Sequence, residues 1–209
     1  MYDQMYWHLT YGSIQHYNPV SLRPAMRNYT IYIDAISKVF AATGVRVGWS
    51  VGPATVINKM KAILTHVGAW APMAEQKAVA NYLGNREGIK KFLSNFKSEI
   101  EERLRRIYDG FMQLKSEGLP VDAIAPEAAI YLTIQIDLVG KKTEEGKMLA
   151  DQSDVTAYIL SEAKLAVVPF YAFGASRNST WYRLSVGTCK KEGINEMIGK
   201  LREALKKLS

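Results

Sequence analysis

Lys38 and Arg46 lie close together in the sequence, between two apolar runs that favour strands. A lysine amine attacks an aldehyde well when nearby cations and partial burial lower its pKa. A guanidinium is the side chain best shaped to hold a phosphate through two parallel hydrogen bonds. The pair indicates a pyridoxal phosphate site. Taken alone, Lys38 could be an ordinary surface lysine and Arg46 a structural ion-pair partner.

Asp3 and Tyr6 place a carboxylate and a phenol three positions apart at the end of a short strand-like run. The carboxylate can pair with a pyridinium nitrogen, and the phenol can hydrogen-bond a ring phenolate. Both interactions help a pyridine ring to accept electrons. The alternative is a frayed chain terminus.

Arg183 lies in an alternating run and is predicted to face away from Tyr182, Leu184 and Val186. A guanidinium held on a strand in this way can clamp a substrate carboxylate. The competing interpretation is an ion pair with Asp137 or Glu127.

The elements that must position these side chains alternate between strands and helices, which predicts an α/β fold. Strands are expected over residues 29–34 and 45–51, and helices over residues 53–64 and 72–83. Apolar residues then recur at steps of three and four between Ile89 and Leu114, which predicts one long helix. Beyond it, the pattern predicts strands over residues 130–138, 165–170 and 181–186, with helices near residues 155–163 and at the C-terminus.

Composition excludes several classes of protein. With 209 residues, 48% of them hydrophobic, the chain can bury a core in one or two domains. Its net charge of +7 arises from basic residues interleaved with acidic ones, which favours solvated helix faces over a nucleic-acid surface. No apolar run is long enough for a membrane span, so we expect no membrane partner. The single Cys189 and three unclustered histidines predict no metal site, and one cysteine fits a reducing, cytoplasmic location.

Short motifs occur in a fixed order along nearly the whole chain. They are Asp3-x-x-Tyr6, Leu9-Thr10-Tyr11-Gly12, Ser37-Lys38, Thr43-Gly44-Val45-Arg46-Val47-Gly48-Trp49, Gly52-Pro53, Ala125-Pro126-Glu127, Pro169-Phe170-Tyr171-Ala172-Phe173-Gly174 and Tyr182-Arg183-Leu184-Ser185. By their order and spacing, the chain resembles the class I/II, fold-type I, pyridoxal-phosphate aminotransferases, the aspartate aminotransferase family.

The resemblance implies a role for each candidate residue. Lys38 would carry the cofactor covalently and shuttle a proton between the substrate Cα and the cofactor. Arg46 would bind the cofactor phosphate, Asp3 the pyridine nitrogen and Tyr6 the O3′ oxygen. Arg183 would clamp the substrate α-carboxylate. The substrates would be an amino acid, aspartate or a similar one, and a 2-oxo acid, and the enzyme would be a homodimer.

The resemblance also implies a domain organisation. Residues 1–83 would form the C-terminal part of the large cofactor domain, residues 84–116 an interdomain helix, and residues 117–209 the small domain. The phosphate-binding turn, stacking ring and asparagine that the family supplies from its N-terminal half have no match, so we expect the C-terminal half of an aminotransferase.

Some family members have a phosphate-binding serine where Ala35 stands, so Ser37 receives no assignment. We expect this chain alone to bind the cofactor weakly and to be inactive. Two other interpretations remain open: a pyridoxal-phosphate C–S lyase or decarboxylase of the same fold, and an inactive folded fragment.

Overall fold

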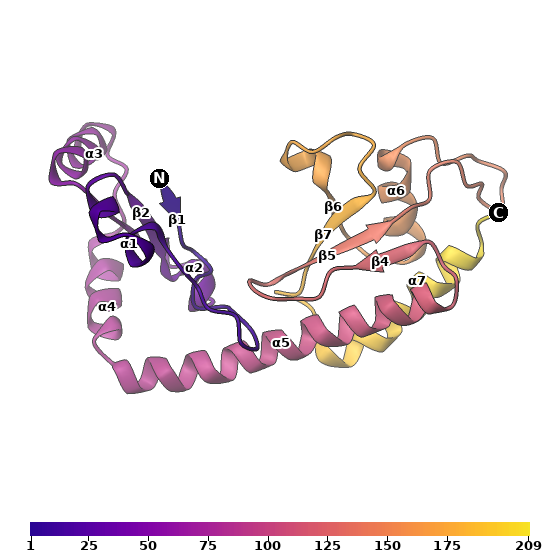
Figure 1. The fold of residues 1–209 in the computed structure, drawn as a ribbon, viewed down its shortest axis with the longest axis horizontal. Coiled ribbons are helices and arrows are strands. Elements are labelled where there is room, and N and C mark those ends of the chain that lie inside the picture. The colour runs from indigo at the N-terminus through magenta and orange to yellow at the C-terminus, as the bar shows by residue number, and fades with distance from the viewer. The chain divides into compact units, whose positions relative to one another are not determined.

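A computed structural model describes residues 1–209 (Figure 1). The chain divides into two compact units, Met1–Lys97 and Ser98–Ser209, and helix α5 (Arg86–Ser116) contributes to both. None of the helices combines the length and the apolar character needed to cross a membrane.

The first unit contains a three-stranded sheet in the order β1-β2-β3. Strand β1 (Tyr2–Asp3) runs parallel to β2 (Tyr32–Ala35), which pairs antiparallel with β3 (Gly48–Val51). The prediction that the two runs flanking the lysine segment are neighbouring strands is therefore confirmed. Gly48 faces Ala35 across the pair, and a Cβ on Gly48 would lie 3.0 Å from the Asp34 carbonyl oxygen. The missing side chain lets β3 approach β2 closely.

The helices of the first unit are α1 (Pro19–Leu22), the 3₁₀ turn η1 (Pro24–Asn28), α2 (Ile36–Val39), α3 (Ala54–Val67) and α4 (Met73–Leu83). Helix α3 extends beyond the predicted end at residue 64 because Gly68 ends it instead, in the left-handed conformation with φ 69°. A small core of Ile36, Val47 and Val79 lies between α2, the residue directly before β3, and α4.

The second unit contains an antiparallel sheet in the order β4-β5-β7-β6. Its strands are β4 (Val121–Ala123), β5 (Tyr131–Ile136), β6 (Val168–Pro169) and β7 (Trp181–Ser185). Its helical elements are α6 (Gln152–Glu162), α7 (Ile194–Lys206) and the 3₁₀ turns η2 (Phe170–Phe173) and η3 (Lys191–Gly193). The predicted strand over residues 165–170 is shortened to β6, because η2 begins directly after Pro169.

The core of the second unit lies between this sheet and helices α5 and α7. Buried apolar side chains of α5 recur at helical spacing, as predicted: Ile100, Leu104, Ile107, Phe111 and Leu114. Figure 1 shows α7 running alongside α5. They approach closely at Gly110, where an added Cβ would lie 2.7 Å from Cγ1 of Ile198. The sheet and the two helices hold β7, and with it Arg183, in a packed framework.

Candidate functional site

Lys38 lies on α2, the single helical turn that begins directly after strand β2. Ile36 and Val39 of the same turn are 4% and 1% exposed, so apolar anchors on both sides fix its orientation. The Phe40 N–H closes the turn on the Ile36 carbonyl at 3.2 Å. Lys38 is half-buried and takes part in no ion pair, which leaves its amine available for chemistry.

Arg46 lies in the loop just before β3, with φ 61° in the left-handed region. This conformation costs an ordinary residue about 1 kcal/mol or more. Arg46 Nη1 donates to the Thr43 carbonyl at 2.8 Å, and the side chain is otherwise exposed without an acidic partner. It lines a cavity of about 710 Å³ together with Ser37, Ser50 and other residues.

Asp3 and Tyr6 are held at the start of the chain by β1, which pairs Asp3 with Ile33 of β2. The N-terminus is therefore paired in the sheet, and the alternative of a frayed chain terminus is wrong. Asp3 Oδ1 accepts a hydrogen bond from the Met5 N–H at 3.0 Å, while the carboxylate takes part in no ion pair and is exposed. The Leu9 N–H donates to the Tyr6 carbonyl at 2.8 Å, and the Tyr6 side chain is half-buried. Met5, between them, lines the same cavity as Arg46.

Asp34 is a buried acid of this region that the sequence interpretation did not single out. It is 5% exposed at the end of β2, and its two oxygens accept hydrogen bonds from the Ala35 N–H at 2.8 Å and the Trp7 indole N–H at 3.0 Å. Burial raises the pKa of this carboxyl group. Asp34 also lines the cavity. An acid closing an apolar strand just before the lysine turn was the signal available in the sequence.

Replacing Asp34 with asparagine should change how stability depends on pH. Because the pKa of Asp34 is raised above its ordinary value of 3.8, the folded chain holds a proton that the unfolded chain releases. The free energy of unfolding therefore falls as pH rises through the window from 3.8 to the raised pKa. We expect wild type to lose stability relative to Asp34→Asn across that window, measured by denaturant unfolding at a series of pH values. A difference that stays constant with pH, or grows in favour of wild type, would contradict this.

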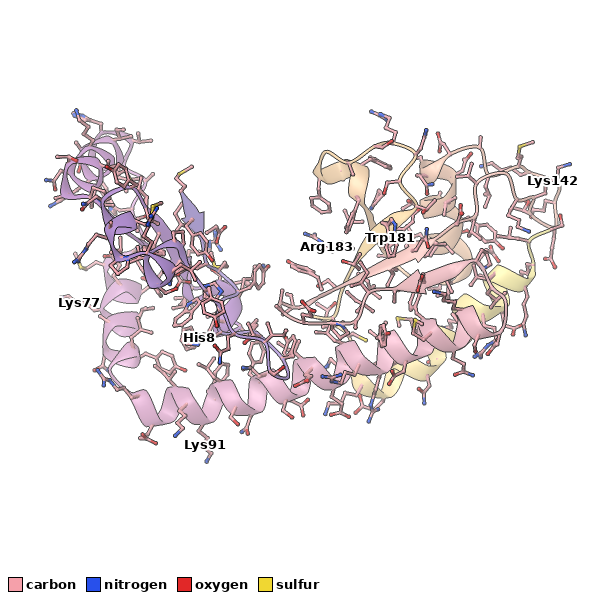
Figure 2. All side chains as sticks on the ribbon, in the orientation of Figure 1. His8, Lys77, Lys91, Lys142, Trp181 and Arg183 are labelled. Carbon is pink, nitrogen blue, oxygen red and sulfur yellow. The ribbon has the colours of Figure 1, made fainter.

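Arg183 lies in the second unit on β7, where the burial pattern places it opposite Tyr182 and Leu184 as predicted. Figure 2 shows its position on the strand. Its guanidinium carbon lies 4.4 Å from the ring centre of Tyr131 and 4.6 Å from that of Phe173. The competing ion pair with Asp137 or Glu127 does not form. The two aromatic contacts take its place.

A buried hydrogen bond between Tyr182 and Gln152 anchors strand β7 to helix α6. The Tyr182 hydroxyl donates to Oε1 of Gln152 on α6, and both side chains are buried. Burial raises the pKa of Tyr182 to about 12, so the phenol stays protonated as a donor. This contact fixes the residue that immediately precedes Arg183.

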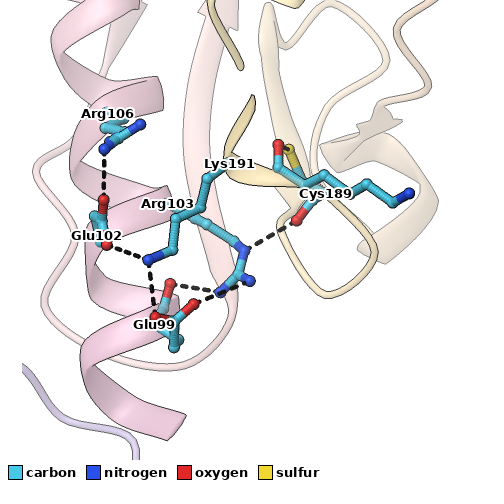
Figure 3. A network of polar contacts seen from close by, with 7 residues as sticks. Glu99, Glu102, Arg103, Arg106, Cys189 and Lys191 are labelled. Carbon is cyan, nitrogen blue, oxygen red and sulfur yellow. Dashed lines mark hydrogen bonds and ion pairs between the residues drawn. The ribbon is translucent and has the colours of Figure 1, made fainter. Parts of the chain in front are cut away.

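The loop after β7 is tied to α5 by a network of charges (Figure 3). Lys191 Nζ donates hydrogen bonds to the carboxylates of Glu99, at 2.8 Å, and of Glu102. Arg103 Nε donates to the Cys189 carbonyl at 2.9 Å. The hydrogen bond from Lys191 lowers the pKa of Glu102, and the same bond raises the pKa of Lys191. The network holds the C-terminal side of β7 on the helix.

The described residues fit pyridoxal phosphate by the chemistry of their donors and acceptors. Arg46 has guanidinium N–H groups not used by Thr43, which suits a phosphate. Asp3 keeps an oxygen that is not used by Met5, which suits a protonated ring nitrogen. Asp3, Tyr6, Lys38 and Arg46 all belong to the first unit, on segments joined by the β1-β2-β3 sheet, whereas Arg183 belongs to the second.

Comparisons of sequence and of structure with known proteins both find aminotransferases. The sequence model of the family "Aminotransferase class I and II" matches residues 1–201. The aspartate aminotransferase of Rhizobium meliloti strain 1021 is 30% identical over 208 residues, which cover 99% of this chain and 48% of that protein. The crystal structure of the aspartate aminotransferase from Rhizobium meliloti superposes with a TM-score of 0.83 at 28% identity, covering 99% of this chain and 49% of that one. The aromatic aminotransferase from Pyrococcus horikoshii OT3 also gives 0.83, at 27% identity, covering 98% and 50%.

The chain thus spans about half the length of the relatives it matches. The fold is the mixed α/β fold of fold-type I aminotransferases over that half. Because the family model matches nearly the whole chain, this chain belongs to the class I and II aminotransferase family.

Proposed function

We propose that the protein containing this chain transfers an amino group between an amino acid and a 2-oxo acid with pyridoxal phosphate as cofactor. The observation that carries the proposal is that Lys38 and Arg46 both lie in the segment that joins β2 to β3, at the end where Ala35 pairs with Gly48, and that neither takes part in an ion pair. The family membership supports the same chemistry, because class I and II aminotransferases use this cofactor. When bound, pyridoxal phosphate supplies an electron sink that stabilises negative charge at the substrate Cα.

In this proposal the chain's own residues divide the work. Lys38 Nζ removes the proton from the substrate Cα, because an amine that holds the cofactor is already positioned at the reacting carbon. Arg46 binds the phosphate, Asp3 keeps a proton on the ring nitrogen, and Tyr6 donates a hydrogen bond to the ring oxygen. Arg183 orients the substrate through its α-carboxylate.

Aspartate or a similar amino acid is the proposed donor, in line with the Rhizobium meliloti relative. No arginine follows Ala69-Trp70-Ala71-Pro72 to hold a second carboxylate, so neutral and aromatic amino acids are the alternative donors. The similarity to the Pyrococcus horikoshii aromatic aminotransferase supports testing them.

We also propose a homodimer in the cytoplasm, with residues 1–83 in the cofactor domain, residues 84–116 linking the domains and residues 117–209 in the small domain. Helix α3 supports association, because it buries none of its residues and exposes Ile63 and Val67 by 61% and 69%. The single free Cys189 supports a reducing compartment.

The proposal is tested by tracing the amino nitrogen of the donor amino acid into its products. The protein expressed from its complete reading frame is supplied with pyridoxal phosphate, ¹⁵N-labelled aspartate and 2-oxoglutarate, and then with labelled phenylalanine. Transfer of the label to glutamate is expected. Conversion of labelled phenylalanine to labelled 2-phenylethylamine would indicate a decarboxylase, and release of labelled ammonia from a labelled amino acid that carries a sulfur substituent on Cβ would indicate a C–S lyase; either result without transfer to glutamate would reject the aminotransferase proposal.

Replacing Arg183 with lysine should raise the KM for the amino acid and the 2-oxo acid together. A compact ammonium cannot reproduce the two parallel hydrogen bonds of the planar guanidinium. Steady-state kinetics of Arg183→Lys with both substrates measure the effect. Arg177→Lys is the matched control, since Arg177 also lies near an aromatic ring, Tyr171, in the same unit. Equal kinetics for wild type and Arg183→Lys would leave Arg183 with a structural role only.

A further inference from the structure

Arg183 is held in an unusual way for a charged side chain on a sheet. It is half-buried, yet it takes part in none of the ion pairs of the chain. Its neighbours in register are Thr133 on β5 and Val168 on β6, and neither carries a charge. Some other interaction must therefore hold the guanidinium over the sheet.

Two aromatic rings supply that interaction. The Arg183 Cζ atom lies 4.4 Å from the ring centre of Tyr131 and 4.6 Å from that of Phe173, well inside the range of about 6 Å for a cation–π contact. Tyr131 belongs to β5 and Phe173 to η2, which follows β6, so the rings come from the two segments that flank β7. Phe173 remains 55% exposed, so core packing does not account for its position.

An aromatic ring and a carboxylate contact different parts of a guanidinium, its planar face and its N–H edge. A carboxylate takes the N–H donors at the edge of the group, whereas a ring that stacks on the guanidinium plane takes none of them. A guanidinium held by rings therefore keeps its donors for a ligand, and no ion pair has to break when the ligand arrives. Holding the group in place before binding also reduces the entropy lost on binding.

We infer that Tyr131 and Phe173 are positioning residues that hold Arg183 by its faces and leave its N–H edge to a planar carboxylate. This inference rests on the proposed function, since it concerns the arginine assigned there to the substrate. The ligand it specifies is a carboxylate that approaches edge-on and accepts two parallel hydrogen bonds, as the α-carboxylate of an amino acid does. Ligands that must stack on the guanidinium are disfavoured, because the rings occupy that space.

The test uses NMR on the 209-residue chain, with sodium acetate as the probe at constant ionic strength. The Nε–H signal of Arg183 is assigned by its loss in Arg183→Lys. The variants are Tyr131→Leu and Phe173→Leu, which remove a ring, and Tyr131→Phe, which keeps the ring without the hydroxyl. Tyr171→Leu is the matched control, since the Tyr171 ring lies near Arg177 instead.

We expect the Arg183 signal in wild type to carry a ring-current shift that each leucine variant reduces and that Tyr131→Phe and Tyr171→Leu preserve. Each leucine variant should bind acetate about two- to five-fold more weakly than wild type. If the leucine variants bind acetate as wild type does, the positioning role is overturned while the carboxylate clamp stands. If acetate does not move the signal in wild type, the clamp fails and the inference fails with it.

Discussion

Replacing Lys38 with alanine is expected to abolish amino-group transfer while leaving the fold intact. Losing a positioned general base alone costs about 10²- to 10⁴-fold in rate, and Lys38 is also the proposed point of covalent attachment. Stability should change little, because Lys38 is half-buried, takes part in no ion pair, and has apolar neighbours Ile36 and Val39 that anchor the turn without it. Transfer of ¹⁵N and the denaturant midpoint are measured on the same preparation.

The matched control is Lys61→Ala, because Lys61 is an exposed lysine that lines the same cavity as Arg46. This variant should keep near-normal turnover. Near-normal turnover of Lys38→Ala would remove Lys38 from the mechanism.

Replacing Arg46 with alanine is expected to weaken cofactor binding by about 2 to 5 kcal/mol, the usual cost of removing one partner of a buried, hydrogen-bonded charge pair. The figure applies to the state in which the bound phosphate buries the guanidinium. Equilibrium titration with pyridoxal phosphate on the protein from its complete reading frame measures it.

Arg46→Gly separates the two roles of this position. Glycine adopts the left-handed conformation at φ 61° without strain, so this variant should be no less stable than Arg46→Ala. Both variants should bind the cofactor equally poorly, because both lack the guanidinium. Unchanged affinity in either variant would remove Arg46 from the phosphate site, and Arg27→Ala, at an exposed arginine of η1, controls for loss of net charge.

Local patterns were enough to predict most elements near the candidate site. The β-rich runs around Lys38 became β2 and β3, and alternation along residues 181–186 placed Arg183 on the correct face of β7. These predictions succeeded because period and residue type act within one segment. The roles of Asp3, Tyr6, Lys38, Arg46 and Arg183 remain predictions.

Features that depend on contacts between distant segments were missed. The aromatic neighbours of Arg183 follow from the register that sets Thr133 opposite Arg183 and from the turn that brings Phe173 back to β7. The pairing register of two strands depends on both strands and on the turns between them, so the sequence of one strand does not predict it. Strand β4 has three residues, too few for a period to be visible, and the partners of Asp34 include Trp7, which is 27 positions away.

The most direct test of the central claim is to locate the lysine that bonds pyridoxal phosphate. The 209-residue chain and the protein from its complete reading frame are incubated with the cofactor, reduced with borohydride, digested and mapped by mass spectrometry, with Lys38→Ala in parallel. We predict a pyridoxyl group on Lys38 in both proteins, with the 209-residue chain needing more cofactor. Labelling spread evenly over other lysines, or the same labelling in Lys38→Ala, would contradict the assignment of this chain's site.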